Sequence, residues 1–217
     1  MVLIKIKIFS PSFFSYYVSF FFAFSLNQVI LNSLHGFENG RMPMETKEAL
    51  RKRRSCRHFL NKQISKTDLQ QIIWAGNTAP IGMGKYQNIH LTVVQNTEML
   101  ARLSSECAET WNGQRFDPRY GAPTLILVSA VLEKEPTAYA NVACVVENMH
   151  LMATDLGLGS IYLWGFIKYL KQNEKLKCDL SIPSEFEPLS ALAVGYAAKP
   201  MKEHDSKKLK IGINFID

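Results

Sequence analysis

The segment Pro123-Thr124-Leu125-Ile126-Leu127-Val128 is an almost unbroken apolar run of strand length. A strand with one face in water alternates apolar and polar residues, whereas a continuous apolar run is typical of a strand covered on both faces. The chain then shows apolar residues at helical spacing, at Val142, Val145, Val146, Met149, Met152, Ala153 and Leu156. Together they predict a sheet with the apolar strand at its centre and a long, largely buried helix packed on it.

Other strand and helix patterns alternate from Met44 onward. Helices are expected over residues 45–53, from Ser65 or Thr67 through Trp74, and after a cap at Asn96 or Thr97. The third helix should carry on one face the residues Leu100, Leu103, Cys107 and Trp111. Strands are expected at residues 91–94, 160–163 and 189–196, and a final β-like piece at 209–215. This alternation predicts an α/β or α+β layered domain over residues 44–217.

Residues 1–43 form a hydrophobic extension in which eight of the thirteen Phe residues fall. A basic start at Lys5 and Lys7, an apolar middle and the small residues Ala23 and Ser25 resemble a signal peptide. The apolar run is also almost long enough for a membrane anchor. The third interpretation is an artefactual start, with translation beginning at Met42 or Met44. All three interpretations stay open.

The net charge of +6 and the pI near 9.1 raise the question of a nucleic-acid partner. Lysines and arginines are interleaved with acids from Lys47 to Lys210, which argues against a dedicated nucleic-acid face. The four cysteines are widely spaced and form no C-x-x-C pair, so they indicate neither a zinc site nor a disulfide framework. A reducing compartment, the cytoplasm, fits this pattern.

Three guanidinium groups and a hydroxyl occur within the five residues Arg53-Arg54-Ser55-Cys56-Arg57, next to a predicted helix. Guanidinium groups donate paired hydrogen bonds to phosphate oxygens, and a hydroxyl adds a further short one. The cluster is therefore a candidate phosphate site. A solvated basic helix end and a nucleic-acid patch are the alternatives.

From Met44 to Asp217 the chain resembles the nitroreductase family of FMN-dependent oxidoreductases. Three segments carry the resemblance: Arg53-Arg54-Ser55-Cys56-Arg57-His58-Phe59, Gly121 to Ile126, and Asn148 to Ser160 with its Gly157-Leu158-Gly159-Ser160 turn. The resemblance implies an α+β, three-layer fold with a mixed, mostly antiparallel central sheet flanked by helices. It also implies a homodimer with FMN at the subunit interface and a C-terminal strand extended to the dimer partner.

The resemblance assigns most of the cofactor site. Arg53, Ser55 and Arg57 would hold the FMN phosphate and ribityl chain, with Arg54 acting mainly through its backbone. The segment passing over the flavin ring would be Tyr162, Leu163, Trp164 and Gly165, and a backbone N–H near Trp164 or Gly165 would face flavin N5. No side chain is expected to be catalytic. Lys208 and Lys210 match a late basic pair that returns to the phosphate, unless Lys207 replaces Lys208 or the tail is simply solvated.

The chain departs from the family pattern after Ala79-Pro80, where the usual Ser and Asn are missing. Ile81, Gly82 and Met83 would line the site from the partner subunit instead. The spacing of the nearby glycines does not match a phosphate loop of the Walker type. Lys85 and Arg119 are candidates for a positive group near the flavin, and the short segment 111–120 predicts an open ring face that accepts many flat molecules.

By resemblance, the expected function is hydride transfer from NADH or NADPH to nitroaromatic, quinone or similar acceptors in a ping-pong cycle. The cofactor would perform the redox step while the protein fixes and tunes the ring. A flavin-binding redox sensor or carrier without turnover is the main alternative. Nucleic-acid binding through residues 51–57 is a third, which the interleaved acids disfavour.

Overall fold

The computed structural model describes residues 43–111, 114–205 and 210–216, and residues 45–217 form the compact unit treated below. The extension expected over residues 1–43 therefore lies almost wholly outside the described residues. Within the described ranges, every helix is too short or too polar to cross a membrane. The predicted early helix is present as α2 (Thr46–Lys52).

The principal sheet has the strand order β1-β4-β6-β5. Its strands are β1 (Ile89–Val94), β4 (Thr124–Ala130), β5 (Gly159–Leu163) and β6 (Glu187–Gly195). Each neighbouring pair is antiparallel, and a single parallel bridge joins Ser55 to Ser160 beside β5. All seven residues of β4 are buried and β4 has a neighbour on each side, which confirms its predicted interior position.

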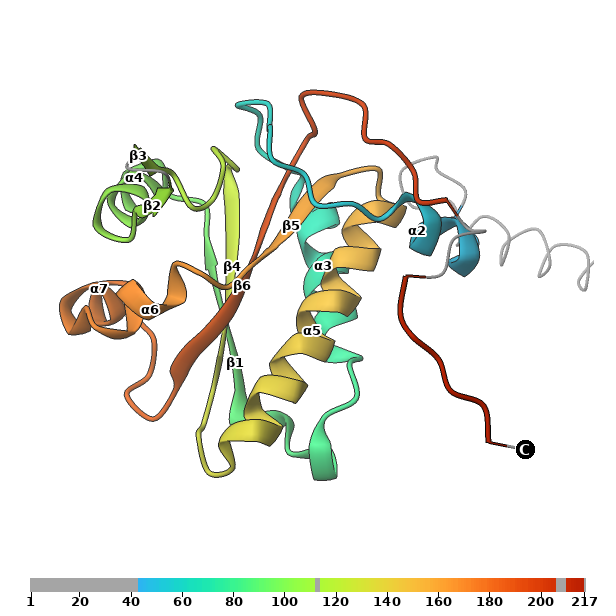
Figure 1. Cartoon of the computed structure of the whole chain (residues 1–217). Helices are drawn as coiled ribbons and strands as arrows, with labels where there is room; N and C mark the ends of the chain where they lie inside the picture. Colours follow the sequence, from blue (N-terminus) through green and yellow to red (C-terminus); the bar gives the residue numbers. More distant parts are fainter. Residues whose placement is uncertain (1–42, 112–113, 206–209, 217) are drawn as a thin grey trace, which may run out of the picture. The chain divides into compact units, whose positions relative to one another are not determined.

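Helices cover both faces of this sheet, as Figure 1 shows. On one face α3 (Lys66–Asn77) and α5 (Glu135–Asp155) share a core with Ile126 and Val128. On the other, α4 (Thr97–Glu106), α6 (Ile167–Lys171) and α7 (Glu174–Asp179) pack with Leu125 and Leu127. Successive side chains of a strand point to opposite faces, so the apolar run of β4 feeds two cores at once. The predicted three-layer α+β fold is confirmed.

Particular residues explain where α3 and α5 begin and how closely the two helices pack. Ser65 caps α3 by accepting a hydrogen bond from the Asp68 amide, and a proline occupies the first turn of α5. A Cβ atom added at Gly76 would lie 3.0 Å from Met149 Cγ. The absence of a side chain at Gly76 thus lets α3 and α5 pack closely.

One expectation about secondary structure is wrong, and another depends on a second subunit. Trp111 does not continue the face of α4, because that helix ends at Glu106; Trp111 lies instead in β2 (Glu109–Trp111), which pairs with β3 (Gln114–Phe116). Leu100, Leu103 and Cys107 are buried as expected. Residues 210–216 form no strand within one chain, and their side chains at Ile211 and Phe215 are more than four-fifths exposed (84% and 82%).

Candidate functional site

The arginine-rich segment follows α2 directly and is fastened to the edge strand β5. The Cys56 amide donates to the Ser160 carbonyl over 2.9 Å, next to the Ser55–Ser160 bridge. Cys56 is buried, while Ser55 and Arg57 are exposed. The backbone of this segment is therefore held by the sheet, and alternate side chains face outward.

The guanidinium groups of Arg53 and Arg54 converge on His204. Arg53 Nη2 lies 3.3 Å from His204 Nε2, and Arg54 Nη1 lies 3.0 Å from His204 Nδ1. Arg53 also approaches Glu147 Oε1 at 3.5 Å. Against the expectation that Arg54 acts mainly through its backbone, its side chain lies in the cluster as well.

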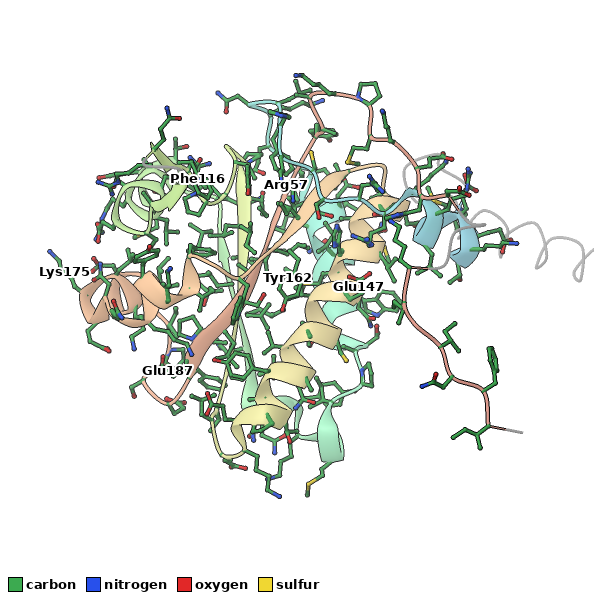
Figure 2. All side chains as sticks on the ribbon, viewed as in Figure 1. Arg57, Phe116, Glu147, Tyr162, Lys175 and Glu187 are labelled. Carbon is green, nitrogen blue, oxygen red and sulfur yellow. The ribbon has the colours of Figure 1, made fainter. Side chains whose placement is uncertain are left out.

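Arg57 stands apart from this pair. Its guanidinium lies 5.9 Å from the Tyr120 ring centroid, and it has no ion pair within the described part of the chain. Arg57 and Phe116 line a cavity of about 720 Å³, together with Gln114, Arg115, Asp117 and Tyr120. Figure 2 shows Arg57 and Phe116 on the same side of the molecule. The short segment that was expected to leave the site open therefore forms one wall of this cavity.

Two titratable residues of α5 lie beneath the arginines. His150 is 1% exposed, and its Nε2 lies 3.4 Å from the Arg54 carbonyl, to which a neutral ring donates. Burial, reinforced by the positive charge of Arg53, lowers the His150 pKa to about 4, so the ring is neutral at pH 7. Burial raises the pKa of Glu147, and Arg53 opposes that shift. His150 thus supports the Arg54 backbone without adding charge.

The predicted ring-contacting segment lies along β5 and just beyond it. The Tyr162 side chain is 36% exposed and that of Trp164 63%, whereas Leu163 is buried in the core and offers only its backbone. Trp164 and Gly165 line a second cavity of about 210 Å³ with Tyr139, Ile167, Lys168 and Lys171. β5 pairs on one side with β6, so its other edge presents backbone donors and acceptors beyond the Ser55 bridge.

The loop with Ile81, Gly82 and Met83 contacts α5 at a different position from the arginine cluster. The Gly82 amide donates to Asn141 Oδ1 over 2.9 Å, whereas Arg53 contacts Glu147, which is about 9 Å further along the helix axis. Ile81 is buried, and Met83 is 84% exposed with a left-handed φ of 59°. The loop and the arginine cluster thus contact α5 at positions six residues apart.

The remaining predicted cations have different surroundings. Lys85 pairs with Glu133 at 2.9 Å, and Arg119 donates to Ser104 Oγ and to the Ala122 carbonyl, both over 2.7 Å. Both side chains are thus engaged in local structure. Lys208, like Lys207, lies outside the described residues, while Lys210 is exposed and close enough for its charge to lower the His204 pKa.

Sequence reasoning missed four residues of this region: Glu147, His150, His204 and Asn141. The only signal for the first two is their separation by three residues on a predicted helix, which places them on one face. His204 is separated from Arg53 by 151 residues, and no spacing pattern links them.

Comparison with known proteins identifies the family. A family model described as "Nitroreductase family" matches residues 50–196. The chain belongs to the nitroreductase family. One curated relative, "Putative NADH dehydrogenase/NAD(P)H nitroreductase" of Archaeoglobus fulgidus, is 30% identical over 155 residues, covering 70% of this chain and 84% of that protein.

Solved nitroreductase structures share the fold. The crystal structure of a nitroreductase with bound FMN from Bacteroides fragilis has 30% identity and a TM-score of 0.67, covering 80% of this chain and all (100%) of that one. A nitroreductase with bound FMN from Desulfitobacterium hafniense has 25% identity and a TM-score of 0.68, with 79% and 100% covered. The fold and the sequence thus point to the same family.

Proposed function

We propose that this nitroreductase-family protein is an FMN-dependent oxidoreductase that takes hydride from NADH or NADPH and reduces nitroaromatic, quinone or similar flat acceptors. The proposal rests on one observation: the arginine-rich segment is hydrogen-bonded to β5. From Ser160, the chain of β5 runs on to Trp164 and Gly165. A strand rises about 3.3 Å per residue, so charged and ring-contacting groups are separated along an elongated path. FMN has its phosphate and its ring at opposite ends, as such a path requires.

The residues at the charged end fit a phosphate. Arg53, Arg54 and Arg57 can donate to anionic oxygens, and the exposed Ser55 hydroxyl adds a further donor. Arg57 has no carboxylate partner within the described ranges, and Glu147 approaches Arg53 at 3.5 Å. Charge-assisted hydrogen bonds from guanidinium groups are about twice as strong as neutral ones, which suits a dianionic ester.

We further propose a homodimer in which each cofactor site uses both chains. The exposure of Met83, at 84%, supports this, because a side chain free on one chain can reach the ring of its partner's cofactor together with Ile81 and Gly82. The exposed apolar residues Ile211, Ile213 and Phe215 would extend onto the partner. Lys210 and Lys208 would then return near the phosphate.

Bound FMN supplies the two-electron redox chemistry, and the chain supplies binding, orientation and access. A backbone N–H at Trp164 or Gly165 would donate to the ring, and no side chain is required as an acid or base. A single open ring face admits the nicotinamide and the acceptor in turn, which predicts ping-pong kinetics. The cytoplasm is the proposed location, with membrane attachment through residues 1–43 as the alternative.

An absorbance spectrum followed by a turnover assay tests this function. The purified protein should show oxidised-flavin bands, release FMN on heating, and oxidise NADH or NADPH steadily when a quinone or nitroaromatic is present. Flavin binding without steady turnover would instead identify a redox sensor or flavin carrier. Colourless protein that FMN cannot reconstitute would contradict the proposal.

A further inference from the structure

The segment 201–205 holds His204 against the arginine pair. The His204 amide donates to the Arg51 carbonyl over 2.8 Å, and the neighbouring Glu203 forms an ion pair with the Arg51 guanidinium. These two contacts anchor the segment at the end of α2. The imidazole ring is thereby placed with one nitrogen 3.3 Å from Arg53 and the other 3.0 Å from Arg54.

The contacts among His204, Arg53 and Arg54 contain too few hydrogen-bond acceptors. A guanidinium group only donates hydrogen bonds, and a neutral imidazole has one donor nitrogen and one acceptor nitrogen. In either neutral tautomer, one ring N–H of His204 therefore faces a guanidinium N–H. In the charged imidazolium form, both ring N–H groups face a guanidinium N–H. An anion with several oxygens placed beside the three groups would supply the missing acceptors, once small side-chain rotations turn the N–H groups toward it.

We propose that His204 is a further ligand of the FMN phosphate, and that phosphate binding is coupled to protonation of its imidazole. This inference rests on the proposed function, since it concerns the same cofactor site. It adds an imidazole, whose ordinary pKa lies near neutral pH, to a site whose other proposed side-chain donors are guanidinium, ammonium and hydroxyl groups.

The charges around His204 explain the coupling. Arg53 and Arg54 face the ring from the segment after α2, and Lys210 adds positive charge from the C-terminal segment. Two acids flank His204 in sequence, Glu203 and Asp205, and Glu203 is paired with Arg51. Partial burial and these cations lower the His204 pKa, so without an anion the ring is neutral at pH 7.

A phosphate dianion reverses this balance, because two negative charges next to the ring favour the imidazolium form. Binding then takes up a proton from solvent wherever the pH lies between the lower pKa of the free site and the higher pKa of the complex. Since the bound state holds more protons, affinity falls as pH rises through that window, by up to about tenfold per pH unit.

The test compares FMN with riboflavin, which has the same ring and no phosphate. Dissociation constants are measured on the flavin-free full chain by flavin fluorescence between pH 7 and 9, where the FMN phosphate is already a dianion. For the wild type, FMN affinity should fall about threefold or more across this range while riboflavin affinity stays flat. His204→Gln should weaken FMN about tenfold at pH 7, abolish the pH dependence, and leave riboflavin unchanged.

His58→Gln is the matched control, because it removes a second histidine near the arginines, one whose side chain is exposed, and should behave as the wild type. Circular dichroism confirms that each variant is folded. If FMN binds more tightly than riboflavin but His204→Gln keeps the wild-type affinity and pH profile, the role of His204 is overturned while the proposed function stands. If neither flavin binds the wild type, the proposed function falls, and this inference with it.

Discussion

The amide of Cys56 donates a 2.9 Å hydrogen bond to the carbonyl of Ser160, and this contact connects the arginine-rich segment to the edge of the sheet. Gly159 precedes Ser160, and a Cβ atom added at Gly159 would lie only 2.8 Å from Cys56 Sγ. The position of the charged segment therefore depends on close contact between two small residues.

Gly159→Ala should destabilise the protein by about 1–3 kcal/mol, because the added methyl overpacks the contact with Cys56. Urea denaturation followed by circular dichroism measures the change. Adding Cys56→Ala removes the nearest atom and should restore part of the lost stability. Lys175→Ala, at an exposed position on α7, is the control and should leave the free energy of unfolding within about 0.5 kcal/mol. Equal effects at both positions would contradict this packing.

His150 should make stability depend on pH in the mildly acidic range. Its pKa is about 4 in the folded chain and near 6.5 when unfolded, so the unfolded state binds more protons between these values. The stabilisation is complete above pH 6.5 and is lost as pH falls toward 4, by up to about 3 kcal/mol. Denaturation at a series of pH values measures the slope, and His150→Gln should flatten it. A wild-type slope in that variant would assign the pH dependence to other groups.

Met83 tests the proposed contribution of one chain to the site of its partner. Its side chain is 84% exposed, so Met83→Ala should change the free energy of unfolding by less than about 0.5 kcal/mol. If it lines the ring of the partner's cofactor, losing its apolar contact should raise the KM for a quinone acceptor about fivefold or more. Steady-state kinetics measures this effect. An unchanged KM would remove Met83 from the substrate site.

The exposed C-terminal segment should hold the dimer together. Ile211 and Phe215 are 84% and 82% exposed in one chain, so changing both to Asp places charges in the proposed interface. Light scattering after size-exclusion chromatography should show a dimer for the wild type and a monomer for this variant, with loss of FMN. Lys175→Asp, on α7, is an exposed charge change elsewhere and should stay dimeric. A dimeric double variant would place the interface elsewhere.

The sequence predicts the elements whose pattern is local. The apolar run of β4 and the helical spacing of α5 are readable because burial on both faces requires apolar residues at consecutive or helical positions. Trp111 was assigned wrongly because its apolar character fits a helix face, while the chain turns into a hairpin after Cys107. Local periodicity does not show where a helix stops and a hairpin begins, nor contacts between the two such as the hydrogen bond from Arg115 to the Ser105 carbonyl.

The candidate site was predictable only in part, for a related reason. Arg53 and Arg57 stand in a short motif, but their surroundings come from distant segments. Glu147 and His204 reach Arg53 only through tertiary packing, and one is on α5 and the other follows β6. Charged residues that are far from Arg53 in sequence follow no periodic pattern relative to it. The geometry of the candidate anion site is therefore visible only in the folded chain.

The most direct measurement is the affinity of the Arg53→Ala, Arg57→Ala double variant for FMN and for riboflavin, beside the wild type. Removing two guanidinium groups from the phosphate should weaken FMN about a hundredfold or more, since each charge-assisted contact contributes about 1.5–3 kcal/mol. Riboflavin affinity should change little. FMN affinity and stoichiometry equal to those of the wild type would contradict the account that this arginine-rich segment holds the cofactor.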